Sequence, residues 1–121
     1  MKTILALLIS LSFIMTASAK GPVYHIVHFK FKSTATRKEI KKIEKEFAAL
    51  EQKISAIQSF EWGTDISPEK LSQGYTHCWI VGFKNEKKRD HYLVHPDHKK
   101  FVEILLPKLE SALVVDFIPK K

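Results

Sequence analysis

The residues that could carry out chemistry gather between positions 74 and 98. This stretch contains His77, Tyr92, His95 and His98. Imidazole can accept or donate a proton near neutral pH, and a phenol can donate a hydrogen bond to a carbonyl oxygen. Such groups either line a pocket or form hydrogen-bonded parts of a packed core, and their spacing alone leaves both interpretations open.

The charge of the chain argues against a nucleic-acid reader. The 121 residues include 20 basic and 13 acidic side chains, for a formal net charge of +7. Nearly all the basic residues are lysines, since Arg37 and Arg89 are the only arginines. Readers of nucleic acids usually combine clustered arginines with a groove-entering motif or aromatic platforms. We therefore expect a solvated lysine surface and no nucleic-acid partner, with weak attraction to anionic membranes left open.

The first 19 residues have the pattern of a cleaved export signal. Lys2 precedes an apolar run at positions 4–15, and Ala17 and Ala19 give the small-x-small pattern that signal peptidase reads. The run is shorter than the roughly 20 residues that span a membrane. We predict a signal peptide at residues 1–19, a mature domain at residues 20–121 and export to a periplasm or to the medium. Stable membrane insertion is not expected after cleavage, and an uncleaved anchor is the alternative.

Hydrophobic periodicity predicts the first strand and the first helix. Residues 23–32 alternate, so that Val27 and Phe29 share one face with His25. Thr36 and Glu39 have the spacing of a capping box, which predicts a helix start. The apolar residues that follow recur every three or four positions, as one helical stripe: Ile40, Ile43, Phe47, Leu50 and Ile54.

The remaining elements complete a β-α-β-β-α-β order. We predict strands at residues 55–64, 75–83 and 113–118, a loop at 65–74, a helix at 86–94 and a helix from Asp97 to about Pro107. Tyr75 should share a strand face with His77, and His95 should cap the carbonyl end of the helix before it. The order is that of an α+β, ferredoxin-like domain, a four-stranded antiparallel sheet with helices on one face.

Both faces of the predicted sheet are rich in apolar side chains. The helices can cover one face, so the other face needs a second cover. Cys78 is the only cysteine, so no intramolecular disulfide can form, and burial or a partner subunit must hold the fold. We therefore expect a homodimer in which the two sheets face each other.

Five short motifs occur in order along nearly the whole mature chain. They are His25-Ile26-Val27-His28-Phe29, Phe60-Glu61-Trp62-Gly63, Gly74-Tyr75-Thr76-His77, His95-Pro96-Asp97-His98 and Val114-Val115-Asp116-Phe117. The set resembles the stress-responsive A/B barrel (Dabb) domain family. The resemblance implies a ferredoxin-like subunit that pairs into a dimeric α/β barrel.

The resemblance also implies a site. A plant polyketide cyclase of the family has a catalytic histidine and a catalytic tyrosine that match His98 and Tyr92, and two pocket histidines that match His25 and His77. His98 is then the candidate general base, and Tyr92 the donor that stabilises an enolate. His25 and His77 would bind and orient the substrate. The implied chemistry is an aldol condensation that needs no cofactor and no obligatory metal.

Other interpretations of these residues stay open. Phe29 and Trp79 could supply an aromatic wall to a substrate pocket, or simply belong to the core. Each histidine could be a hydrogen-bonded structural residue. A metal site could draw on His95, Asp97 and His98, although their spacing matches no strong zinc signature.

Two functions from different classes follow. The first is an exported homodimer that binds a small apolar or aromatic molecule in a pocket lined by histidine and tyrosine. The second is a cofactor-independent lyase or cyclase that uses His98 and Tyr92. The export signal favours the first, because polyketide chains are made inside cells. The joint presence of Tyr92, His98, His77 and His25 favours the second.

Overall fold

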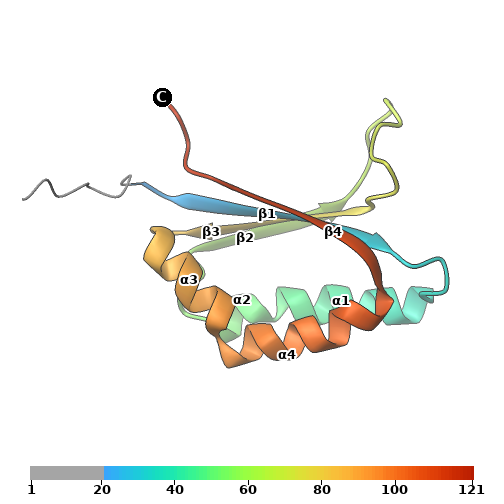
Figure 1. The fold of residues 1–121 in the computed structure, drawn as a ribbon, viewed down its shortest axis with the longest axis horizontal. Coiled ribbons are helices and arrows are strands. Elements are labelled where there is room, and N and C mark those ends of the chain that lie inside the picture. Colours follow the sequence, from blue (N-terminus) through green and yellow to red (C-terminus); the bar gives the residue numbers. More distant parts are fainter. Residues whose placement is uncertain (1–20) are drawn as a thin grey trace, which may run out of the picture.

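The computed structural model describes residues 21–121, so the predicted signal peptide lies outside the described residues. The elements in chain order are β1 (Val23–Phe31), α1 (Arg37–Ala48), α2 (Leu50–Lys53), β2 (Ser59–Thr64), β3 (His77–Phe83), α3 (Glu86–Val94), α4 (Pro96–Leu105), the 3-10 turn η1 (Leu106–Lys108) and β4 (Leu109–Phe117). The strands form one antiparallel sheet in the order β2-β3-β1-β4, and the helices cover one of its faces (Figure 1). The predicted ferredoxin-like α+β fold is confirmed.

The helix-covered face holds the core because the apolar side chains of β1, β3 and α1 converge there. Phe29 and Trp79, from neighbouring strands, have ring centroids 5.7 Å apart. Phe47 of α1 stacks on Trp79, with ring centroids 4.3 Å apart and planes inclined by 16°. All three side chains are almost completely buried. Their burial is the main source of stabilisation, and the stacking adds to it.

The capping box of α1 forms as predicted. Thr36 Oγ1 accepts a hydrogen bond from the Glu39 amide at 3.2 Å, and Glu39 Oε1 accepts one from the Thr36 amide at 3.1 Å. Lys108 forms a salt bridge with the same carboxylate. The hydrogen bond from Lys108 and those from Thr36 lower the pKa of Glu39 to about 2. The start of α1 is thus tied to the turn that precedes β4.

Two strand boundaries differ from the prediction by four residues, and the others differ by no more than two. β2 begins at Ser59 rather than at residue 55, because the chain turns at residues 55 and 56 after α2. β4 begins at Leu109, four residues before the predicted start at 113, because it pairs along nearly the whole length of β1. Apolar periodicity did not reveal this early part of β4, since Glu110 and Ser111 interrupt it.

The predicted shared face of Tyr75 and His77 is wrong. Gln73 and Gly74 have φ angles of 55° and 87°, which turn the chain just before β3 begins. The Tyr75 hydroxyl lies 2.6 Å from Ser111 Oγ, on the face of the sheet away from the helices. His77, by contrast, is buried under the helices.

The predicted role of His95 at the end of α3 is also wrong. Its side chain caps the helix that follows, because His95 Nδ1 accepts a hydrogen bond from the Asp97 amide at 3.1 Å. Pro96 is the first residue of α4, a position where its missing N–H leaves no helical hydrogen bond unmade. Only the backbone N–H of His95 reaches back, to the carbonyl of Tyr92 at 3.1 Å.

The face of the sheet away from the helices is open. Leu113, Val115 and Phe117 of β4 are each about half exposed there, and Ile26 and Ile80 extend the apolar strip across β1 and β3. We call this surface the open face. None of the helices within residues 21–121 has the length and apolar character needed to cross a membrane.

Replacing Thr36 by alanine is expected to lower the free energy of unfolding by about 1 kcal/mol, because the Glu39 amide loses Thr36 Oγ1 as its hydrogen-bond acceptor at the start of α1. Urea denaturation followed by circular dichroism measures the change. Thr34→Ala, at an exposed turn position nearby, is the matched control and should change stability by less than about 0.5 kcal/mol. Equal losses in the two variants would contradict the capping role.

Candidate functional site

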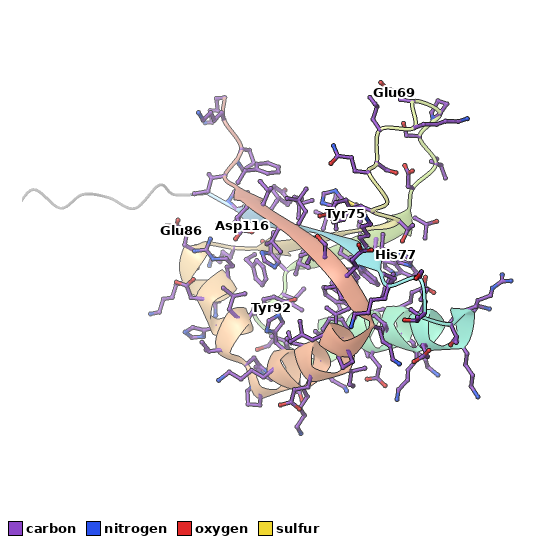
Figure 2. All side chains as sticks on the ribbon, turned by 45° about the vertical axis from the view of Figure 1, so that its right-hand side comes forward. Glu69, Tyr75, His77, Glu86, Tyr92 and Asp116 are labelled. Carbon is purple, nitrogen blue, oxygen red and sulfur yellow. The ribbon has the colours of Figure 1, made fainter. Side chains whose placement is uncertain are left out.

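A polar cluster lies between the sheet and the two helices that follow β3. Tyr92 of α3 is at its centre, with the ring centroid of His98 of α4 at 4.4 Å and that of His25 of β1 at 5.8 Å. Phe83 closes one side, with its ring centroid 5.1 Å from that of Tyr92. We call Tyr92, His98, His25 and Asp116, which is the hydrogen-bond partner of His25, the Tyr92 cluster; Figure 2 labels Tyr92 and Asp116.

Tyr92 is a buried phenol whose hydroxyl has no hydrogen-bond partner within residues 21–121. The residue is fully buried, and its oxygen makes no hydrogen bond to any other atom of residues 21–121. Burial raises the pKa of Tyr92 far above its usual value, because the phenolate would lose its hydration. The hydroxyl therefore keeps its proton and is available as a donor to a carbonyl or hydroxyl oxygen.

His98 is half-buried and has a defined tautomer. Its Nδ1 lies 3.2 Å from the carbonyl oxygen of Leu93, which can only accept, so Nδ1 carries the proton and Nε2 keeps its lone pair. Burial lowers the pKa of His98, opposed by the Leu93 carbonyl and assisted slightly by the charges of His25 and His95. A neutral imidazole with a free Nε2 is the form that a general base requires.

His25 is held in place from two other elements. Its Nδ1 donates to Asp116 Oδ1 of β4 at 2.6 Å, and Asp116 Oδ2 accepts from Arg89 Nη1 of α3 at 3.0 Å. The bond to Asp116 is the main cause that raises the pKa of Arg89. His25 itself is nearly buried. This chain of charge-assisted bonds fixes the ring of His25 beside Tyr92.

Asp116 and Arg89 were not among the predicted site residues. A signal for Asp116 was present in the sequence, since it is the one charged residue within the apolar stretch at 113–118. A lone acid there needs a partner, but its partner His25 lies 91 residues away along the chain. Nothing in the spacing of α3 distinguishes Arg89 from its exposed basic neighbours.

His77 lies elsewhere. His25 is opposite Val81 in the sheet, four residues along β3 from His77, or roughly 13 Å. His77 Nε2 is 2.7 Å from Glu44 Oε2, and its Nδ1 is 2.7 Å from Thr76 Oγ1. Both ring nitrogens are therefore occupied, and Figure 2 shows His77 well apart from Tyr92.

The structure thus brings together three of the six predicted site residues. His25, Tyr92 and His98 are in contact, whereas Phe29 and Trp79 stack with Phe47 inside the core. Trp79 Nε1 is buried and makes no hydrogen bond within the described chain.

A cavity of about 600 Å³ lies on the other side of the sheet, between the open face and residues 71–76. Its lining includes His28, Trp62, Tyr75, His77 and Leu113. Of the six predicted site residues it borders only His77. The residue Cys78 also lines it, and burial raises the pKa of that thiol, which keeps it protonated.

The predicted alternative of a metal site has little geometric support. No group of three or more histidine, cysteine, aspartate or glutamate side chains within residues 21–121 is arranged to hold a metal ion. His95 Nδ1 and Asp97 Oδ2 are 3.8 Å apart, but that nitrogen already caps α4.

The fold and the cluster together define a ferredoxin-like α+β subunit with a histidine–tyrosine site between its sheet and its helices. Comparison with protein families then gives a direct assignment, because the model of the stress responsive A/B barrel domain matches residues 23–119. The chain belongs to this family, as its motifs predicted.

Two well-described proteins are similar to this chain in sequence. The chain is 38% identical over 101 residues to the stress-response A/B barrel domain-containing protein HS1 of Arabidopsis thaliana, covering 84% of this chain and 93% of HS1. It is 29% identical over 99 residues to olivetolic acid cyclase of Cannabis sativa, covering 82% of this chain and 98% of the cyclase.

Solved structures share the fold of this chain. A hydroxynitrile lyase from Passiflora edulis superposes with a TM-score of 0.79 at 25% identity, covering 85% of this chain and 97% of the lyase. A dimeric protein of ferredoxin-like fold from Bacteroides fragilis superposes with a TM-score of 0.67 at 28% identity, covering 84% and 100%. The same fold therefore carries at least two different named activities.

His98 is expected to titrate below the ordinary histidine pKa of 6.5, because burial disfavours its charged form. It should also show the tautomer with the proton on Nδ1. Two-dimensional ¹H–¹⁵N NMR of the imidazole rings measures both, with His98→Gln to assign the signals. A midpoint at or above 6.5, or a proton on Nε2 at pH 8, would contradict this geometry.

Proposed function

We propose that this protein is an exported, homodimeric member of the stress responsive A/B barrel family that binds a small apolar or aromatic molecule at the Tyr92 cluster. The ligand carries a carbonyl or hydroxyl oxygen that accepts a hydrogen bond from Tyr92. The observation that carries the proposal is the fully buried Tyr92 phenol, which has no hydrogen-bond partner among the described residues. A buried donor without an acceptor costs about 1–3 kcal/mol, which a bound oxygen would recover.

The surroundings of Tyr92 suit such a molecule. The rings of Phe83, His25 and His98 pack around Tyr92, so a ligand bound there would lie among flat rings. The hydrogen bond from His25 to Asp116 leaves its Nε2 as a second acceptor or donor beside the phenol. Small-molecule sites are usually lined by apolar side chains with a small number of polar groups among them.

A cofactor-independent lyase or cyclase is the second candidate. The specific observation in its favour is the neutral His98 with a free Nε2 next to a protonated phenol. In this reaction His98 Nε2 removes a proton from the carbon next to a carbonyl, and Tyr92 donates to the enolate oxygen that forms. The enolate carbon then attacks a second carbonyl of the same molecule. The attack turns the oxygen of the second carbonyl into an alkoxide, which takes up the proton that His98 removed.

Relatives support both candidates. HS1 is similar over most of its length and is named for its stress response, whereas olivetolic acid cyclase and the Passiflora lyase are named for reactions. Binding is the common requirement of all of them, so we place it first.

Tyr92→Phe is expected to weaken the binding of an aryl β-diketone such as benzoylacetone about tenfold, the equivalent of one lost hydrogen bond of about 1.4 kcal/mol. Isothermal titration calorimetry measures this. Tyr24→Phe, which removes a phenol from the open face, is the matched control and should bind as the wild type does.

Three outcomes of this experiment are informative. Equal affinities in wild type, Tyr92→Phe and His98→Ala would overturn the binding site. Binding without turnover of the diketone, of a linear polyketide or of mandelonitrile by the wild type would overturn the second candidate. If the wild type shows turnover, and Tyr92→Phe and His98→Ala lose it while remaining folded, the lyase or cyclase activity would be the function.

The open face supports the proposed homodimer. Leu113, Val115 and Phe117 remain about half exposed on it, and a second sheet is the cover of matching shape and chemistry. The similar Bacteroides fragilis protein is described as dimeric. Export rests on the sequence of residues 1–19.

Native mass spectrometry of the protein from its own host is expected to show a dimer of chains that begin at Lys20, with any retained small molecule as added mass. Leu113→Asp with Val115→Lys should shift the mass to a monomer, because these charges would lie within the interface. A wild-type monomer at micromolar concentration would contradict the dimer. A chain that begins at Met1 would contradict cleavage of the signal.

A further inference from the structure

Two segments project from the open face at opposite ends of the sheet. Residues 65–76 form an arm between β2 and β3, and residues 118–121 form a tail after β4. Both lie on the side away from the helices, the arm at the right and the tail at the left of Figure 1. Any second copy that covers the open face must meet both.

Hydrogen bonds hold the arm in a defined conformation. The Asp65 amide donates to the Thr76 carbonyl at 2.8 Å and closes its neck, and the Ser67 amide donates to Asp65 Oδ1 at 3.0 Å. Tyr75 anchors its base through Ser111, while Glu69 lies at its tip (Figure 2). The arm therefore presents its side chains in defined positions.

Large apolar side chains on this arm face solvent. Ile66 is 93% exposed and Leu71 is 71% exposed. Both sit on a loop held by hydrogen bonds, so the exposure is not relieved by collapse onto the sheet. Two large apolar side chains held in solvent in this way are available to contact a partner.

The cavity beneath the arm also has an unused polar atom. His28 lines it, and His28 Nδ1 is buried without a hydrogen bond to the rest of the described chain. Leu71 and Tyr75 of the arm, and Leu113 of β4, form apolar parts of the same wall. An incoming peptide segment could fill the apolar part and bond to His28 through its backbone.

The chain's own tail does not reach this cavity. Phe117, the residue before the tail, is opposite Tyr24 in the sheet, whereas His28 lies four residues further along β1, or roughly 13 Å away. The tail then continues away from the arm (Figure 1).

We propose that the cavity under each arm receives Phe117 and the tail of the second copy, so that the two copies clasp each other twice. This inference rests on the proposed homodimer and goes beyond it by naming the contact. A two-fold interface repeats every contact, so the arm-to-tail contact forms at both ends. The strands of the two sheets must then run in opposite directions across the interface. The other direction would bring the two arms together at one end.

The charges of the two segments are complementary. Glu61 and Asp65 line the cavity and form no salt bridge within the described residues. The tail contributes Lys120 and Lys121. Complementary charge at the rim of an interface favours the correct register over alternatives.

Disulfide cross-linking tests the clasp. In a Cys78→Ala background, one preparation carries Leu71→Cys and a second carries Phe117→Cys. Mixed and mildly oxidised, they should form a cross-linked heterodimer as the main product, while neither preparation alone cross-links above background. Ile66→Cys in place of Leu71→Cys gives a second arm position if the first variant is poorly folded.

The outcomes separate the clasp from the dimer itself. A monomer by native mass spectrometry would overturn both. A dimer in which Leu71→Cys cross-links to itself would overturn the clasp and place arm against arm. A dimer with no cross-link from either arm position would overturn the clasp and leave the cavity to a small molecule.

Discussion

The antiparallel pairing of β1 with both β3 and β4 is the constraint on which the rest of this structure depends. β1 is central, so its alternation decides what lies on each face of the sheet. Phe29 and His25 point to the helices, where the first joins the core and the second meets Tyr92. His28 points to the open face. A shift of the register by one residue would exchange these two sets, remove the core and separate His25 from Asp116.

The polar groups of the Tyr92 cluster are of two kinds: some are held by hydrogen bonds within the described chain, and the Tyr92 hydroxyl is not. Arg89, Asp116 and His25 form a continuous chain of hydrogen bonds from α3 through β4 to β1, so their positions are strongly determined. Tyr92 lies beside this chain but donates to nothing within residues 21–121. A buried phenol that donates to no atom of residues 21–121, beside a chain of paired polar groups, is the basis for the ligand proposed above.

Local patterns in the sequence were enough to predict the fold. The capping box of α1 and the alternation of β1 depend on neighbours within a few residues, and both were found as expected. The predicted stripe from Ile40 to Ile54 also faces the core, although the helix divides into α1 and α2 at Ala49 and Ile54 follows α2. The predictions were wrong where a backbone angle or a distant partner determines the direction or the hydrogen bond of a side chain. The positive φ of Gly74 turned Tyr75 onto the open face, and Pro96 joined α4 with His95 as its cap.

The site was less predictable for the same reason. The motifs indicated His25, Tyr92, His98 and His77 as a group, but only the three-dimensional register of β1 and β3 shows that His77 lies apart. Spacing carries no information on Asp116 and His25, which are brought together by the pairing of the first and last strands. Long-range contacts of this kind need the assembled sheet.

Adjacent residues of β4 connect the two faces of the molecule. Asp116 points to the helix side and holds His25, while Phe117 points to the open face and precedes the tail. Since they share a backbone, whatever fixes Phe117 also limits the movement of Asp116. A clasp across the dimer would therefore stiffen the hydrogen-bond chain that positions His25, even though the two faces are separated by the sheet. On this argument the second copy acts on the Tyr92 cluster through β4 and does not need to contribute a side chain to it.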